Sequence, residues 1–271
     1  MSHWFCLPHL SGLRISGADA AAFVHAQFTS DLLSPAGPSK WRLTAWCNPK
    51  GRVIGVIVVR AHEDRVDLVV PASQIETLPQ ALSRYAIGRK LRFSDPLAVA
   101  GTFARTDPRC TLAIDPQRAL DLDQAEALED RESAQRWRLC DLRSGIAWLS
   151  PQTSGQFLPQ ALGLEERGGL SYRKGCYPGQ EIIARVHFLG RAKERLSAFL
   201  LDETAEISDN RVQDHAGQQV GVILGSEPTG TRRFGLAVTS TAADLAGSFE
   251  CAGRKLEFQS MSPCASIDAE N

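Results

Sequence analysis

The sequence predicts an α+β protein whose C-terminal part is a small all-β unit. Up to about residue 105, β-rich runs alternate with segments that carry apolar residues at helical spacing. After residue 190 only short β-rich runs remain, with Gly, Asp and Pro between them, which is typical of a small barrel or sandwich. Domains commonly have roughly 100–200 residues, so the 271 residues predict about two units. We place an α+β region at 1–190, a β-barrel at 191–262 and a disordered tail at 263–271.

The N-terminal region begins with strands and one helix. Asp19 is a candidate N-cap for this helix, and Phe23, Val24 and Phe28 give the helix an apolar face. An Asn-Pro-Lys-Gly turn at 48–51 separates two of the β-rich runs, so we expect an antiparallel hairpin. The β-rich runs of this region lie at 13–16, 41–47, 52–60, 65–70 and 96–103, and a loop is expected at 34–40.

Further helices are expected between these strands and the C-terminal unit. Pro71 suits the start of a helix over 72–87, although Pro79 lies inside it. A charged connecting region carries a helix over 123–140, and a short helix is expected within the loop at 155–172. The β-rich runs of the C-terminal unit lie at 195–202, 218–226, 232–239 and 254–260.

Composition describes an ordinary soluble protein. The chain is 43% hydrophobic and 23% charged, with a formal net charge of -1, so nothing global attracts it to nucleic acid or to a membrane. We see no secretory signal and no apolar run of the ~20 residues that cross a bilayer. The seven cysteines are scattered, without a C-x-x-C pair. This pattern favours reduced thiols in the cytoplasm over a disulfide framework or a metal site, and no bound metal is expected.

One cysteine stands in a segment suited to presenting a thiol. In the stretch RKGCYPGQEIIARV, Cys176 follows Arg173 and Lys174, lies between two glycines and precedes a helix expected from about Pro178. Nearby cations and a helix N-terminus stabilise a thiolate, and glycines permit a sharp turn. The alternative is a buried structural cysteine, because free cysteine is among the most buried residue types. Local features alone do not decide between these interpretations.

A second candidate is the stretch at 137–157. Trp137 and Trp148, together with two arginines, would suit a flat heteroaromatic ligand through stacking and hydrogen bonding. The alternative is that both tryptophans belong to the hydrophobic core. The sequence lacks the two common glycine-rich phosphate-binding motifs, paired-histidine metal motifs and a G-x-S-x-G elbow.

These residues resemble the YgfZ-type folate-binding proteins, which are relatives of the glycine-cleavage T-protein, an aminomethyltransferase. The motif K-G-C-Y-x-G-Q-E is matched in full, and SGQFLPQ lies about twenty residues upstream. The segments ISGADAAAFVHAQFTSDL and NPKGRV are similar to the opening of the family. The matching motif residues are Lys174, Gly175, Cys176, Tyr177, Gly179, Gln180 and Glu181, followed by Ala184 and Arg185.

The resemblance implies a three-lobed ring with a folate pocket at its centre. Two intertwined α+β lobes would come from residues 1–190, and the β-barrel would close the ring. The implied function is tetrahydrofolate-dependent support of iron–sulfur cluster enzymes, including those that modify tRNA, with Cys176 as the essential thiol. Trp137 matches a tryptophan expected against the pterin. The resemblance also favours a monomer that contacts iron–sulfur enzymes or assembly proteins transiently and does not bind nucleic acid itself.

The sequence departs from the family pattern at several positions. Pro178 replaces a common threonine, which stiffens the turn without removing the thiol. Arg143 occupies the place where the T-protein has a pterin-binding carboxylate, and a guanidinium cannot accept hydrogen bonds from pterin N–H groups. Arg143 could instead pair with a ligand carboxylate. Leu10 replaces a second aromatic residue. Arg143 favours the accessory protein over aminomethyl transfer, whereas Leu10 predicts a lower affinity for folate or a different pose.

Two alternatives remain open at this stage. One is a folate-dependent aminomethyltransferase of the T-protein class. The other is a cysteine-dependent thiol or acyl-transfer enzyme without folate, which needs a base near Cys176; His187 is the candidate. In the favoured interpretation the chemistry of Cys176 is undecided between a thioether, a persulfide, a disulfide and transient iron ligation.

Overall fold

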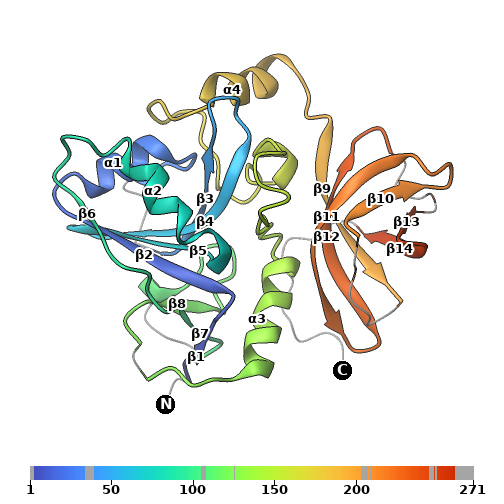
Figure 1. Cartoon of the computed structure of the whole chain (residues 1–271), viewed down its shortest axis with the longest axis horizontal. Helices are drawn as coiled ribbons and strands as arrows, with labels where there is room; N and C mark the ends of the chain where they lie inside the picture. Colours follow the sequence, from blue (N-terminus) through green and yellow to red (C-terminus); the bar gives the residue numbers. More distant parts are fainter. Residues whose placement is uncertain are drawn as a thin grey trace.

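The computed structural model describes residues 3–33, 40–104, 108–124, 126–202, 207, 209–243, 247 and 249–259. Most of the loop predicted at 34–40 and the whole tail predicted at 263–271 lie outside these residues. Within the described part, the fold combines α-helices, two antiparallel sheets and a closed β-barrel (Figure 1). No helix of the described part is both long and apolar enough to cross a membrane.

A five-stranded antiparallel sheet forms the N-terminal part, with the order β3-β4-β5-β2-β6. Val56 and Val58 of β4 pack into one hydrophobic cluster, whereas Ile57 and Val59 pack into another cluster on the opposite face. Because both faces are buried, this strand is a continuous apolar run rather than an alternating one. The bounds are β2 Leu10–Ser16, β3 Arg42–Cys47, β4 Val53–Ala61, β5 Arg65–Pro71 and β6 Arg92–Phe93.

Two helices cover one face of this sheet. Helix α1, Ala20–Gln27, confirms the first predicted helix, but the carboxylate of Asp19 accepts a hydrogen bond from the backbone N–H of Lys90 instead of capping it. The helix predicted over 72–87 is wrong in its bounds. A 3-10 turn (η1, Ala72–Gln74) comes first, and α2 runs from Thr77–Ser83. Pro79 then lies in the first turn of α2, where its missing N–H costs nothing.

A small sheet and a long helix connect the N-terminal sheet to the barrel. Strands β1 (Phe5–Cys6), β7 (Ala100–Thr102) and β8 (Ala119–Asp121) form the small sheet, and a 3-10 turn, η2 (Pro108–Cys110), lies between β7 and β8 in the chain. The strand predicted at 96–103 is therefore limited to three residues. Helix α3, Arg131–Arg143, starts later than the predicted 123–140 because Asp130 caps it by accepting from the N–H of Ser133. Figure 1 shows α3 standing between the sheets and the barrel.

The C-terminal part is a closed six-stranded barrel, which confirms the predicted β-barrel. Its strand order is β10-β11-β12-β9-β14-β13, and β10 pairs with β13 to close the ring. The four predicted runs correspond to β9, β11, β12 and β14, whereas β10 and β13 were not predicted. The bounds are β9 Glu194–Leu201, β10 Arg211–Asp214, β11 Gln219–Thr229, β12 Arg232–Ser240, β13 Phe249–Cys251 and β14 Arg254–Gln259.

Helix α4, Gln180–Leu189, lies beside the turn between β3 and β4, near the top of Figure 1. A short 3-10 turn, η3 (Gln160–Leu162), supports it, since the Gln160 side chain donates to the carbonyl of Ile183. Gly179 precedes the helix with φ +81° and faces Gly51, which has φ +74°. A Cβ on Gly179 would lie 2.5 Å from the carbonyl oxygen of Asn48. The close approach of the two turns therefore requires glycine there.

We expect Gly179→Ala to lower the free energy of unfolding by at least about 2 kcal/mol, since it adds left-handed strain to a backbone clash. Gly175 lies in the same segment, but a Cβ there would meet no atom within 4 Å. Gly175→Ala is therefore the matched control and should change stability by less than about 1 kcal/mol. Urea unfolding of both variants makes the comparison; equal losses would contradict the packing described here.

Candidate functional site

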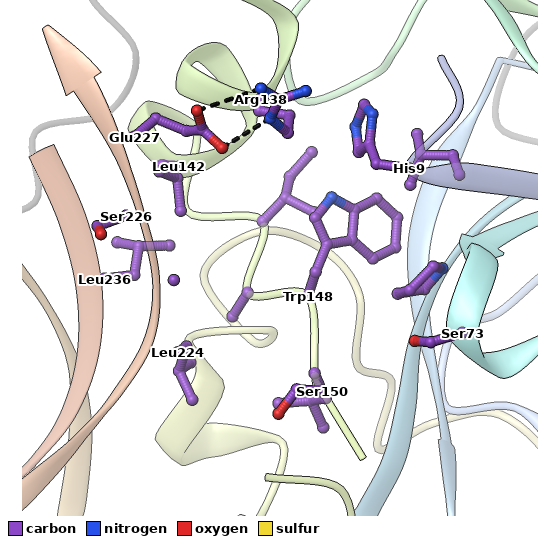
Figure 2. Close-up of a pocket in the computed structure, with 16 residues that line it drawn as sticks. His9, Ser73, Arg138, Leu142, Trp148, Ser150, Leu224, Ser226, Glu227 and Leu236 are labelled. Atoms are coloured by element: carbon purple, nitrogen blue, oxygen red, sulfur yellow. Dashed lines mark hydrogen bonds and ion pairs between the residues drawn. The ribbon is translucent and has the colours of Figure 1, made fainter. Parts of the chain in front are cut away.

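A cavity of about 310 Å³ lies where three parts of the fold meet (Figure 2). The N-terminal sheet and η1 contribute one wall, α3 and the loop after it contribute the second, and β11 and β12 contribute the third. This volume is at the small end of the range for organic ligands. The lining residues are His9, Leu10, Pro71, Ser73, Arg138, Leu142, Ile146, Ala147, Trp148, Leu149, Ser150, Leu224, Gly225, Ser226, Glu227 and Leu236.

The indole of Trp148 is the aromatic surface of this cavity. Its Nε1–H donates to Oδ2 of Asp141 at 2.8 Å. Oδ1 of Asp141 accepts from Nη1 of Arg118 at 2.6 Å, and Asp115 accepts from Nε of Arg118 at 2.7 Å. Burial alone would lower the pKa of Arg118, but the carboxylates of Asp141 and Asp115 outweigh burial and raise it. A buried charge network thus fixes the orientation of the indole.

His9 brings an unpartnered polar group to the cavity. Both ring nitrogens are buried, and neither makes a hydrogen bond within the described residues. Burial, with a smaller contribution from the positive charge of Arg138, lowers the pKa of His9 to about 4. The imidazole is therefore neutral at pH 7, with one nitrogen able to donate and the other able to accept. Buried polar atoms without partners are uncommon, and here they suit the polar edge of a ligand.

An ion pair connects α3 to the barrel at the edge of this cavity. Nε of Arg138 lies 2.6 Å from Oε1 of Glu227, and its Nη2 lies 3.4 Å from Oε2. Figure 2 shows the ion pair and His9 above the indole of Trp148, with Leu236 to its left and Leu224 below and to the left. The cavity therefore offers an aromatic face, apolar walls and a polar edge, which together suit a flat heterocycle.

The structure places the two predicted folate-binding residues outside this cavity lining. Trp137 is 1% exposed and packs in the core, 6.1 Å from the ring of Phe5 and 5.7 Å from that of Phe103. Arg118 also lies over its ring. Arg143 is half-buried in the last turn of α3 and does not line the cavity. Trp148, the other tryptophan of the predicted stretch, is the one that lines it.

Sequence reasoning missed the polar residues of this cavity. His9 lies 129 positions from Arg138, and Glu227 comes from the barrel, so no local pattern connects them. The position of Asp141 on α3 could have been recognised in the sequence as functionally informative. It is an acidic residue on the helix face shared by Ala134 and Trp137, and a buried carboxylate on such a face needs a partner.

Cys176 lies on the turn before α4 and is exposed, as the thiol-presenting interpretation expects. It is the only exposed cysteine among the six that the structure describes. The functional role of its thiol stays a prediction. Cys176 is not among the residues lining the cavity of Trp148, so the two candidate sites are separate.

Lys174 holds the turn that carries Cys176 (residues 174–179, here called the cysteine turn) against the end of α1. Its side chain is 8% exposed, and its ammonium donates to the carbonyls of His25 and Phe28 at the end of α1. It also lies 4.9 Å above the ring of Tyr177, which is itself buried. Burial lowers the pKa of Lys174 to about 8. The charge of Lys174 therefore serves to fasten the turn to α1.

The remaining residues of the predicted motif lie on or beside α4. Glu181 and Arg185 form an exposed pair with 3.6 Å between charged atoms, and Gln180 begins the helix. Nδ1 of His187 lies 3.1 Å from Glu165, and its ring stacks on Tyr172 at 3.9 Å. The structure thus gives the candidate base partners other than Cys176. Within the described residues, no group of three or more His, Cys, Asp or Glu side chains could hold a metal ion.

We expect acid to destabilise the protein through His9. In the unfolded chain the imidazole of His9 takes up a proton below pH ~6.5, but in the folded chain it stays neutral down to pH ~4. The free energy of unfolding therefore falls as the pH drops through that window. Urea unfolding at pH 7 and pH 4.5 should show that His9→Leu removes about 1–3 kcal/mol of this loss. His215→Leu, at an exposed site, is the control. An unchanged pH dependence in His9→Leu would contradict the burial of a neutral imidazole.

Comparison with known proteins identifies the fold and the family. No family model matches the chain. Its structure is similar to the crystal structure of the glycine cleavage system aminomethyltransferase T from Bartonella henselae, with a TM-score of 0.70 and 12% sequence identity over 95% of this chain and 84% of that one. This similarity establishes a T-protein fold. The chain is also 30% identical over 214 residues to an uncharacterized protein from Haemophilus influenzae, covering 76% of each. The chain therefore belongs to the same family as that Haemophilus protein and has the fold of the glycine-cleavage T-protein.

Proposed function

We propose that this chain is a tetrahydrofolate-binding accessory protein that supports iron–sulfur cluster enzymes, and through them tRNA modification. The observation that carries the proposal is the cavity at the meeting point of three parts of the fold, with the indole of Trp148 held by Asp141 and with His9 unpartnered at its edge. The T-protein fold and the complete KGCYPGQE motif support the same interpretation. In this proposal the two α+β lobes and the barrel surround the folate as a ring.

The cavity residues match the chemistry of a pterin. The indole of Trp148 offers a face on which a flat ring can stack. Neutral His9 can both donate to and accept from the edge of such a ring. Arg143 stands where the resemblance places a pterin-binding carboxylate, but Glu227 brings a carboxylate to the cavity from the barrel. We propose that Glu227, held by Arg138, accepts from the pterin N–H groups.

Cys176 supplies the second part of the proposed function. Its exposed position on a stiff turn suits contact with a partner protein. We propose that transient encounters with iron–sulfur enzymes or their assembly proteins use this thiol, and that the protein acts in the cytoplasm as a monomer. Its near-zero net charge gives no electrostatic reason for direct binding of tRNA.

We expect Trp148→Leu to weaken tetrahydrofolate binding roughly tenfold or more, because it removes the aromatic face at a cost of about 1.4 kcal/mol. Isothermal titration of the reduced folate under anaerobic conditions measures this. Trp46→Leu is the matched control, since Trp46 is also half-buried but packs against a different hydrophobic cluster. Equal affinities of the two variants, or no binding by the unmodified protein, would sink the folate proposal.

Replacing Cys176 should separate thiol function from folate binding. Cys176→Ser is expected to leave the folate affinity within about twofold of the unmodified protein, because the residue does not line the cavity. In cells lacking the native protein, the same variant should fail to restore iron–sulfur enzyme activity, whereas Cys110→Ser should restore it. Full restoration by Cys176→Ser would exclude the thiol from the function.

The T-protein fold itself favours one second candidate, aminomethyl transfer to tetrahydrofolate. The absence of a carboxylate at position 143 argues against it. Incubation with an aminomethylated lipoyl carrier and tetrahydrofolate decides the matter. Formation of methylene-tetrahydrofolate at a rate proportional to protein concentration would establish this candidate, and no turnover would exclude it.

A further inference from the structure

Helix α4 ends with two apolar side chains in solvent. Phe188 is 68% exposed and Leu189 is 84% exposed. Both belong to an ordered helix, and the ring of Phe188 lies 4.6 Å from that of His187, which is in turn bound to Glu165. The rings of Tyr172 and His187 therefore hold the side chain of Phe188 on the surface. An exposed apolar pair at a helix end is a feature of interaction surfaces.

A cleft of about 670 Å³ adjoins this helix end. Val186, two positions before Phe188, and Arg191, two positions after Leu189, both line the cleft, so the cleft lies beside the end of α4, although Phe188 and Leu189 are not among its lining residues. Its apolar walls come from three parts of the chain: the loop before η3, helix α4, and the paired start of β11 and end of β12. The apolar residues that line it are Phe157, Leu158, Val186, Val220, Val222 and Val238.

The same cleft carries an excess of positive charge. Arg52, Arg191 and Lys193 line it, against Glu194 as the one acidic residue. Arg191 and Lys193 are exposed, and neither makes an ion pair within the described part of the chain. Local charge of one sign around an apolar cleft steers and selects an oppositely charged partner.

We propose that the end of α4 and this cleft form a docking site for an acidic protein segment that carries apolar anchor side chains. The aliphatic walls and the exposed Phe188 and Leu189 would bury the anchors, and Arg191 and Lys193 would pair with carboxylates at the rim. Nucleic acid fits less well, because three cations and one carboxylate give the cleft little positive charge with which to hold a phosphate backbone. The cleft shares no lining residue with the cavity of Trp148, so this inference does not depend on folate binding.

The docking site and the cysteine turn lie at opposite ends of helix α4. Helix α4 has 10 residues and so spans roughly 15 Å, and Cys176 lies four positions before its first residue. A partner segment seated at one end of α4 would bring its own surface over the other end. If Cys176 acts as proposed above, such a site would bring the thiol to one class of partner protein.

The test is site-specific photocrosslinking in cells with the full chain. A benzophenone amino acid replaces Leu189, and the control replaces Ile87, which is 87% exposed and also flanked by the exposed cations Arg84 and Arg89. We expect a specific protein crosslink at 189, whose segment is identified by mass spectrometry and is acidic with apolar residues. A synthetic peptide copying that segment should bind the purified protein, as measured by fluorescence anisotropy.

Two variants make the result specific. Arg191→Ser combined with Lys193→Ser should weaken peptide binding roughly three- to tenfold and reduce its salt dependence, and Leu189→Glu should weaken it further. Both variants change exposed residues, and unaltered circular dichroism will show that the fold is intact. The proposal is overturned if crosslinking at 189 does not exceed that at 87. It is also overturned if the crosslink joins a second copy, the tail of the same chain, RNA or a segment without acidic residues.

Discussion

The central part of the structure depends on one buried cation, the guanidinium of Arg118. It is fully buried, and each of its three nitrogens has a partner: Asp115 at Nε, Asp141 and the carbonyl of Trp137 at Nη1, and Ser144 at Nη2. A buried charge is tolerated only when it is paired and hydrogen-bonded in this way. Asp141 also accepts a hydrogen bond from the indole N–H of Trp148. This one ion network therefore fixes the position of the aromatic face of the cavity.

A second constraint holds the cysteine turn, and it is steric rather than electrostatic. Gly179 and Gly51 face each other so closely that a Cβ on Gly179 would clash with the backbone of the opposite turn. Lys174 then fastens the turn to the end of α1. The thiol is thus carried by the N-terminal sheet, whereas the cavity forms where the sheet, α3 and the barrel meet. Two sites with different supports can serve one function, with ligand binding at the centre and protein contact at the surface.

Local patterns predicted the elements whose boundaries are local. The hairpin at 48–51 follows from its turn residues, and α4 follows from the glycine turn that precedes it. Local patterns do not reach the features that distant parts of the chain decide. Neither tryptophan of the stretch at 137–157 carries a local signal that separates core from cavity. In the structure, Arg118 lies over the buried ring of Trp137, whereas Asp141 accepts a hydrogen bond from the indole N–H of Trp148 at the cavity. The late start of α3 is a smaller case, because the capping by Asp130 outweighs the helix propensity of the preceding alanines and glutamates.

We propose that a folate binds in the cavity beside Trp148 and away from the cysteine turn. Hydrogen–deuterium exchange of the full chain, with and without saturating tetrahydrofolate, tests it directly. We predict slower exchange in the loop at 146–150 and in β11 around Leu224 and Glu227, with the turn at 174–179 unchanged. Protection confined to the cysteine turn, or no protection anywhere, would contradict the account.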